Sequence, residues 1–176
     1  MDTIPNEIIN AIFNYLPFND VIAFTKTSKK YNEISLNLQY IHCNDSNLKS
    51  LNIPPSLTLQ HIDCSYNNLT SLNIHDTLIN LQHIDCYYNK LTSLNIPDTL
   101  TKLKHINCHW NCLISMNIPD TLINLKTLCC SHTELTSLNI PKTLTNLQKI
   151  ICFKNNLTSL NIPDTLTKLK YIDCSY

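Results

Sequence analysis

Hydrophobic and polar residues follow one another in a repeated order along most of this chain. Residues 81–102 read LQHIDCYYNKLTSLNIPDTLTK, and similar stretches begin near residues 38, 59, 103, 125, 147 and 169. The first of these copies is one residue shorter, and the full copies begin 22 residues apart. Self-similarity with a period of about 20 to 50 residues is typical of solenoids. We therefore predict a solenoid over residues 37–176, preceded by a separate unit over residues 1–36.

Each copy has seven apolar positions, which in residues 81–102 are Leu81, Ile84, Cys86, Leu91, Leu94, Ile96 and Leu100. Stacking in register would bring each position into a column, so that neighbouring repeats bury a shared core. At the start of each copy, apolar and polar residues alternate, which indicates a short strand. Together the repeats predict a seven-strand parallel sheet near residues 40–43, 61–64, 83–86, 105–108, 127–130, 149–152 and 171–174. The proline in L-N-I-P-D-T-L opposes a helix, so we expect extended or 3₁₀ structure on the convex side.

The first half of each copy resembles the leucine-rich repeat pattern L-x-x-L-x-L-x-x-N-x-L, with cysteine at the third apolar position. The short second half is similar to that of bacterial leucine-rich repeats whose convex segment reads L-P-x-x-L. The composition and regularity also resemble the repeat proteins of large DNA viruses of amoebae, which implies a location in the host cell.

Asparagine and cysteine form further columns. The first asparagine column follows the strands, at Asn67, Asn89, Asn111 and Asn155. We expect it to satisfy backbone groups at the bend, and the second column (Asn52, Asn73, Asn95, Asn117, Asn139 and Asn161) to do the same on the convex side. The cysteine column is Cys43, Cys64, Cys86, Cys108, Cys130, Cys152 and Cys174. A buried thiol packs as a small hydrophobe, so we assign this column to the core.

The N-terminal unit has helical rather than strand periodicity. Apolar residues at Ile8, Ile12, Phe13 and Leu16 have the spacing of one helix face, and Pro17 ends that helix. Asp20 or Asn19 can cap a second helix and Thr27 or Ser28 a third. The expected fold class is therefore α+β: a short three-helix unit followed by the solenoid.

This unit resembles an F-box. The motifs are Ile4-Pro5-x-Glu7-Ile8, Ile12-Phe13-x-Tyr15-Leu16-Pro17, Asp20-Val21, and Thr27-Ser28-Lys29 to Tyr31-Asn32. The resemblance implies binding to a Skp-type adaptor of a cullin ubiquitin ligase through Ile4, Pro5, Ile8, Ile12, Leu16 and Pro17. Ile4 replaces the commoner leucine. The alternative is that these helices only cap the open end of the solenoid core.

Strand residues between the inward-facing ones should lie on the concave surface. There the sequence varies from repeat to repeat and is rich in aromatic and polar types. Tyrosine and tryptophan on a rigid scaffold are common interface anchors. We predict a partner-binding site at Tyr66, Tyr87, Tyr88, His109, Trp110 and His132.

Composition narrows the function further. The chain has 13 basic and 13 acidic residues, with every basic residue a lysine, so it lacks the basic stripe and arginines typical of nucleic-acid binding. No signal peptide or membrane-length apolar stretch occurs, so we expect a cytoplasmic protein with its nine cysteines as thiols. Glycine is absent, so any residue with positive φ should be Asn or Asp.

No nucleophile with an adjacent base, phosphate loop or paired-carboxylate pocket occurs, so we expect neither an enzyme nor a cofactor. The pairs His61-x-Asp63 and His83-x-Asp85 could bind a metal ion or form a ladder of hydrogen bonds between histidine and aspartate. We adopt the hydrogen-bonded ladder. The pattern ends at Tyr176 without a polar cap, which predicts self-association through the open edge. The expected function is that of a substrate receptor for a Skp/cullin ligase, with an interaction scaffold as the alternative.

Overall fold

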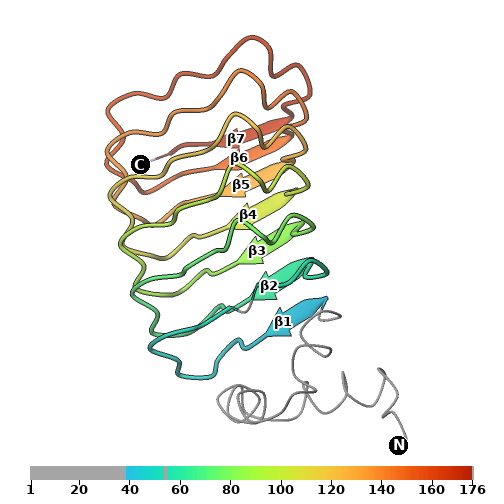
Figure 1. The fold of residues 1–176 in the computed structure, drawn as a ribbon. Helices are drawn as coiled ribbons and strands as arrows, with labels where there is room; N and C mark the ends of the chain where they lie inside the picture. Colours follow the sequence, from blue (N-terminus) through green and yellow to red (C-terminus); the bar gives the residue numbers. More distant parts are fainter. Residues whose placement is uncertain (1–38, 54, 176) are drawn as a thin grey trace, which may run out of the picture.

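The computed structural model describes residues 39–53 and 55–175. The helices predicted within residues 1–36, and with them the six residues expected to face an adaptor, lie outside this part of the chain. The described residues form a solenoid in which every repeat contributes one three-residue strand (Figure 1). The strands are β1 (Tyr40–His42), β2 (His61–Asp63), β3 (His83–Asp85), β4 (His105–Asn107), β5 (Thr127–Cys129), β6 (Lys149–Ile151) and β7 (Tyr171–Asp173).

All seven strands are parallel and follow one another in chain order across a single sheet. The register matches equivalent residues of successive repeats, as in His61 beside His83 and Ile62 beside Ile84. Between β1 and β2 the partner of Tyr40 is His61, which accommodates the shorter first repeat. The predicted parallel sheet is therefore confirmed, although each strand ends one residue earlier than expected, before the cysteine.

The core consists of the apolar columns that the repeat predicts. All seven apolar positions of residues 81–102 are at most 5% exposed, and they join one continuous cluster with their equivalents in the other repeats. Complete burial of a leucine or isoleucine side chain contributes roughly 1.5–3 kcal/mol. Stacking of repeats, rather than any single repeat, therefore provides the stability of the fold.

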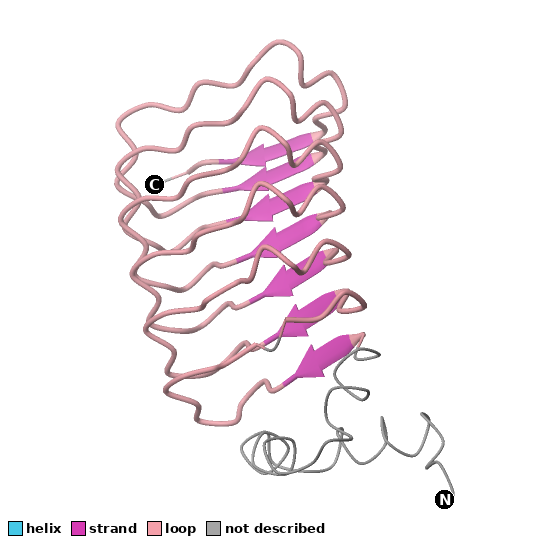
Figure 2. Cartoon of the chain, viewed as in Figure 1, coloured by secondary structure: helices cyan, strands magenta, loops and turns pink. Residues whose placement is uncertain are grey.

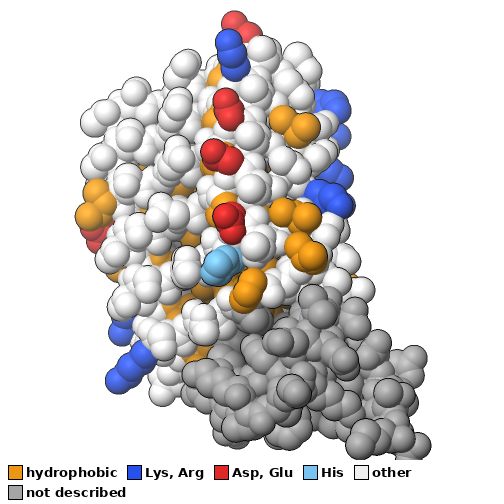
Figure 3. Space-filling view, in the orientation of Figure 1, with side chains coloured by type: hydrophobic (Ala, Val, Ile, Leu, Met, Phe, Trp, Pro, Cys, Tyr) orange, Lys and Arg blue, Asp and Glu red, His pale blue; other side chains and the backbone are white. Residues whose placement is uncertain are grey.

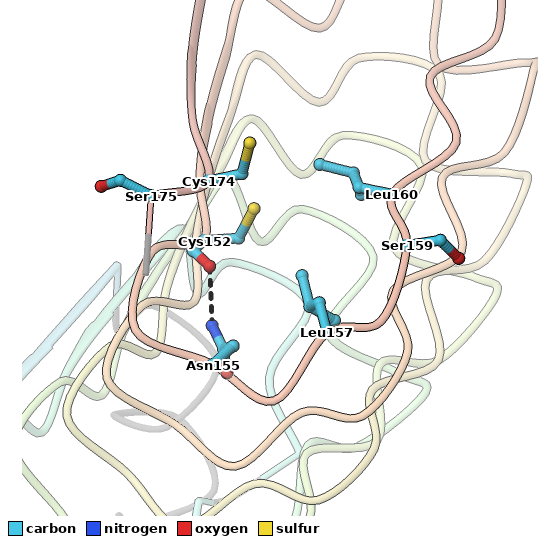
Figure 4. A pocket seen from close by; sticks show the side chains of 7 residues that line it. All are labelled: Cys152, Asn155, Leu157, Ser159, Leu160, Cys174 and Ser175. Carbon is cyan, nitrogen blue, oxygen red and sulfur yellow. Dashed lines mark hydrogen bonds between the residues drawn. The ribbon is translucent and has the colours of Figure 1, made fainter.

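The cysteine column packs into this core in six of its seven positions. Cys174 is exposed, so its predicted burial is wrong, because none of the described residues packs over β7. At this end the side chains enclose a hollow lined by Cys152, Asn155, Leu157, Ser159, Leu160, Cys174 and Ser175 (Figure 4). Self-association through this edge stays a prediction.

The first asparagine column ties adjacent repeats together, as predicted. The Nδ2 group of Asn89 donates to the carbonyl oxygens of Cys64 and Cys86, at 3.0 and 3.1 Å. Its Oδ1 atom accepts the backbone N–H of Leu69 at 2.9 Å. Asn67 and Asn111 make the equivalent bonds. We call this column, with Asn155, the asparagine ladder.

The fifth repeat departs from the asparagine ladder. Thr133 donates to the carbonyl of Cys130 at 3.0 Å and to Oδ1 of Asn155 at 2.5 Å. It does not bond to the carbonyl of Cys108 in the preceding repeat, which is the equivalent of the Cys64 carbonyl that Asn89 reaches. The bend of the fifth repeat is therefore the weakest step in the ladder.

The convex side consists of turns. In one repeat Leu100 N–H donates to Pro97 at 3.2 Å, and Leu103 N–H donates to Leu100 at 2.9 Å. These two isolated turns do not continue into a helix, and no helix of any type occurs among the described residues (Figure 2). Of the expected extended or 3₁₀ structure, the described convex side has extended chain, as in the bridge between Asn95 and Asn117, joined by isolated turns. No helix within this part of the chain has the length and apolar character needed to cross a bilayer.

Threonines, together with asparagines outside the predicted second column, connect the convex turns; Asn124 Nδ2, for example, donates to the carbonyl of Thr101 at 2.8 Å. Thr99 Oγ1 donates to the carbonyl of Asp76 at 2.6 Å, and Thr121 Oγ1 donates to that of Asp98 at 2.7 Å. The second asparagine column is exposed, and no hydrogen bond of its side chains is found in the described part of the chain. That prediction is wrong because the flanking leucine and isoleucine point inward and turn the asparagine outward. Figure 3 shows acidic side chains in a row along the solenoid. In the convex turns, Asp76, Asp98 and Asp120 are exposed.

Completing the asparagine ladder should stabilise the solenoid. Thr133→Asn adds an amide that can bond to the carbonyl of Cys130 in its own bend and to that of Cys108 in the preceding bend, so we expect about 1 kcal/mol of added stability. Asn111→Ala leaves buried backbone groups without partners and should cost about 3 kcal/mol. Urea unfolding followed by circular dichroism measures both changes. Asn117→Ala, on the exposed convex side, is the control; a loss as large as that of Asn111→Ala would contradict the structural role of the ladder.

Candidate functional site

The concave face carries the side chains that flank the buried centre of each strand. In β2 to β5 the middle residue is buried and both neighbours are half-buried. Among the predicted partner-binding residues, Tyr66, Tyr88 and Trp110 are 46%, 53% and 48% exposed. Tyr87, His109 and His132 are half-buried. All six lie just after strands β2 to β5, where the chain leaves the sheet.

These six residues form one connected group of rings, which we call the aromatic ladder. Tyr88 lies 5.0 Å from Tyr66 and 5.9 Å from Trp110 between ring centroids. Trp110 stacks on His132 at 3.8 Å. Tyr87 contacts the edges of the Tyr66 and His109 rings, at 4.8 and 5.1 Å. The structure therefore brings all the predicted residues together, while their role in binding a partner stays a prediction.

Four residues of the aromatic ladder have backbone angles in the left-handed region. The φ angles are 52° at Tyr66, 56° at Tyr88, 54° at Trp110 and 49° at His132. The expectation that Asn or Asp would take every such position is therefore wrong, although Asp45 and Asn47 do so. A non-glycine residue in this region costs roughly 1–2 kcal/mol.

Apart from Asn47, the left-handed positions among the described residues share one place in the repeat, directly before the ladder position. Tyr88 N–H bonds to the carbonyl of His109 at 3.0 Å, and Asn89 then enters the asparagine ladder. The inter-repeat bonds on both sides hold the backbone in this conformation. Asp45 and Lys154 occupy the same strained position in other repeats, so the bend sets the conformation whichever side chain stands there. The position before the ladder asparagine is the sequence signal that identifies this conformation.

A second set of rings lies at the beginning of the strands. Tyr40, His61, His83 and His105 stack in succession, with centroid separations of 4.7, 4.2 and 4.5 Å. We call the three imidazoles the histidine stack. Burial lowers the pKa of His83 to about 4, assisted by the neighbouring imidazoles and by Lys104. Burial also lowers the pKa values of His61 and His105. The stack is therefore neutral at pH 7.

Two carboxylates lie between the histidine stack and the aromatic ladder. Ser65 Oγ donates to Oδ1 of Asp63 at 2.7 Å and to Oδ1 of Asp85 at 3.2 Å. Asn107 Nδ2 also donates to Asp85, at 2.9 Å. Burial raises the pKa of Asp85, and repulsion from Asp63 adds to this effect. Asp63 and Asp85, which we call the acidic pair, are thus held together against their repulsion.

The described residues contain no group of three or more histidine, cysteine, aspartate or glutamate side chains placed to hold a metal ion. The histidines stack on one another and the acidic pair bonds to Ser65, so the two groups do not form the predicted hydrogen-bonded ladder of histidine and aspartate in the described part of the chain. Outside the cysteine column, Cys112 and Cys129 are half-buried. Burial raises the pKa of Cys129, which reduces the thiolate fraction expected of a reactive cysteine.

The histidine stack should make the solenoid less stable in mild acid. Because burial lowers the folded-state pKa of His83 from 6.5 to about 4, the unfolded chain binds more protons between these values. The contribution of neutral His83 to the free energy of unfolding is then fully present above about pH 6.5 and is lost as the pH drops toward 4. The raised pKa of Asp85 has the opposite effect, because it adds stability as the pH falls. This effect is confined to low pH, since the ordinary pKa of an aspartate is 3.8.

Urea midpoints measured between pH 4.5 and 7.5 test this dependence. His83→Gln should flatten the profile relative to the wild type, while the Asp85 contribution cancels in that comparison. His75→Gln, on the convex turn, serves as the control. Equal slopes for the wild type and His83→Gln would contradict the assignment to the stack.

Comparison with known proteins adds two family matches. The model of the BspA-type leucine-rich repeat region matches residues 82–173 in six copies, which is more than half of the chain. The F-box domain model matches residues 1–42. No curated protein sequence matches the chain significantly.

Several solved structures have the same fold. The functional domain of InlJ from Listeria monocytogenes, described as including a cysteine ladder, has a TM-score of 0.73 and 24% identity, over 84% of this chain and 31% of that one. The internalin InlF from the same species has a TM-score of 0.58 and 22% identity, over 68% and 36%. A Shigella effector leucine-rich repeat domain has a TM-score of 0.61 and 24% identity, over 82% and 67%. This chain therefore spans about a third of the two Listeria proteins, and at these identities the likeness concerns the fold.

Proposed function

The chain belongs to the BspA-type leucine-rich repeat family, and from this premise we propose that it is the substrate receptor of a Skp/cullin-type ubiquitin ligase. In this proposal the F-box domain at residues 1–42 binds a Skp-type adaptor. The concave face of the solenoid binds the target protein. F-box domains and leucine-rich repeats are protein-interaction modules, so a protein-interaction role holds for the chain as a whole.

The aromatic ladder is the observation that carries the target-binding half of the proposal. Tyr66, Tyr88 and Trp110 are each about half exposed although their backbone is strained. Exposed tyrosine and tryptophan offer contact area at low cost in conformational entropy. The position that carries the exposed rings changes from repeat to repeat, as Tyr88, Trp110 and His132 show, while the core stays constant, which supports recognition of one particular protein surface.

The charge distribution supports a protein rather than a nucleic acid as the target. Asp63 and Asp85 lie on the concave face, where they would repel a phosphate backbone. A receptor of this kind would act in the cytoplasm, and in the host cell if the protein is viral. That location is part of the proposal.

Adaptor capture tests the proposal. The full chain, immobilised through an affinity tag, should retain a purified Skp-type adaptor. Ile4→Asp combined with Leu16→Asp should reduce retention at least tenfold, because charges would replace apolar contacts at positions that match the F-box motif. Ile114→Asp adds a charge at a solenoid side chain that is 56% exposed, and it should retain the adaptor like the wild type.

Failure of the wild-type chain to retain the adaptor would reject the receptor function. The F-box-like residues would then act as a cap, and the protein would be an interaction scaffold. Equal retention by the wild type and the double variant would reject the predicted adaptor-facing residues.

A further inference from the structure

The concave face carries carboxylates along its first strands and two lysines near β6, beside Asp173 of β7. From β1 to β4, the outward residues of the strands and of the bends that follow include Asp45, Asp63 and Asp85 but no lysine. Lys149 and Lys154 lie at β6 and the bend after it. The acidic end coincides with Tyr66 and Tyr88, the first two exposed rings of the aromatic ladder.

No lysine forms an ion pair with the acidic pair among the described residues. Within the described ranges, its one ion-pair contact is between His42 Nδ1 and Asp63 Oδ2, at 3.9 Å. Lys104, which precedes β4, donates to Oε1 of Gln82 at 2.7 Å. In addition, Oδ1 of Asn107 accepts no hydrogen bond, although its Nδ2 group donates to Asp85. This part of the face therefore has more hydrogen-bond acceptors than donors.

The acidic pair and the aromatic ladder are electrostatically connected through Tyr87. A hydrogen bond with Tyr66 raises the pKa of Tyr87 to about 12, and burial and the negative charges of Asp85 and Asp63 add to this shift. The Tyr87 ring in turn contacts the edge of Tyr66. Ser65, whose hydroxyl lies 2.7 and 3.2 Å from the two carboxylates, directly precedes Tyr66, and Asp85 lies two residues before Tyr87. The carboxylates and the rings therefore adjoin at the ends of β2 and β3.

We propose that the acidic pair, together with Tyr66, Tyr87 and Tyr88, binds a lysine or arginine side chain from an extended segment of the target protein. The cation would donate hydrogen bonds to Asp63 and Asp85 and relieve their mutual repulsion. Its alkyl stem and charge would lie against the tyrosine rings, in the arrangement of a cation–π contact. This inference rests on the proposed function, since it specifies what the concave face recognises.

An extended segment fits the dimensions of the face. Parallel strands are spaced about 4.8 Å apart, so the four repeats that carry the aromatic ladder extend over roughly 15 Å. A segment of about five extended residues has the same length. Stacking of single-stranded RNA on the rings is the competing interpretation, but it requires a basic groove, whereas this end of the face is acidic.

Fluorescence of the full chain provides the test, because Trp110 is its single tryptophan and lies within the aromatic ladder. The probe is an acetylated eight-residue peptide that alternates lysine and serine, and its control alternates glutamate and serine. We expect the lysine peptide to change Trp110 emission in a saturable and salt-sensitive way, and the glutamate peptide to have no effect. Asp85→Asn should weaken binding of the lysine peptide at least fivefold, and Asp63→Asn should act similarly.

The matched control is Asp120→Asn, which removes the same charge from the exposed convex side and should bind like the wild type. Circular dichroism establishes that each variant keeps its fold. Unchanged affinity in both Asp85→Asn and Asp63→Asn, or equal binding of the glutamate peptide, would overturn the inference. Binding of an oligouridylate without binding of the lysine peptide would replace it with the stacking interpretation.

Adaptor capture separates this inference from the proposed function. A chain that retains the adaptor but ignores the lysine peptide rejects the cation site and leaves the receptor function intact. A chain that fails to retain the adaptor can still bind the lysine peptide through Asp85. That result supports the cation site and makes the protein an interaction scaffold instead of a receptor.

Discussion

The asparagine ladder is the interaction on which the rest of the structure depends. Leucine and isoleucine columns supply most of the stability, but their similar shapes tolerate small shifts between repeats. The amide of Asn89, bonded to the carbonyls of Cys64 and Cys86, requires one register. That register places histidine on histidine and Asp63 beside Asp85. The residue before each ladder position has a positive φ even in the fifth repeat, where His132 precedes Thr133, so the bend of the repeat as a whole sets this conformation.

Much of the fold could be predicted from the sequence because the repeats can be compared with one another. The constant Ile84 and Cys86 positions identify both the strands and the core. The convex side could not be predicted as fully, because L-N-I-P-D-T-L is compatible with turns, extended chain or 3₁₀ structure. Hydrogen bonds to carbonyl groups of the neighbouring repeat, such as the bond from Thr99 to Asp76, determine which of these conformations forms. The exposure of Cys174 depends on what packs over β7, which the repeat pattern does not encode.

The members of the candidate site were predictable, whereas their physical chemistry was not. Alternation along the strands and the aromatic types led to Tyr88 and Trp110. The left-handed backbone was missed because the lack of glycine suggested asparagine or aspartate for such positions. The histidine stack and the Ser65 bond that links the acidic pair depend on side-chain distances between adjacent strands. These distances follow from the register and from rotamers, which a one-dimensional pattern leaves open.

The central claim is that constant residues make the fold while variable concave residues make the site. Replacing Tyr66, Tyr88, Trp110 and His132 together by asparagine tests it most directly. Lost ring contacts cost about 0.5–1.5 kcal/mol each, and relief of the left-handed strain returns about 1–2 kcal/mol each. Thermal unfolding followed by circular dichroism should therefore give a melting temperature within about 5 °C of the wild type. A fall of more than about 15 °C would show that these rings hold the fold together and would contradict the account.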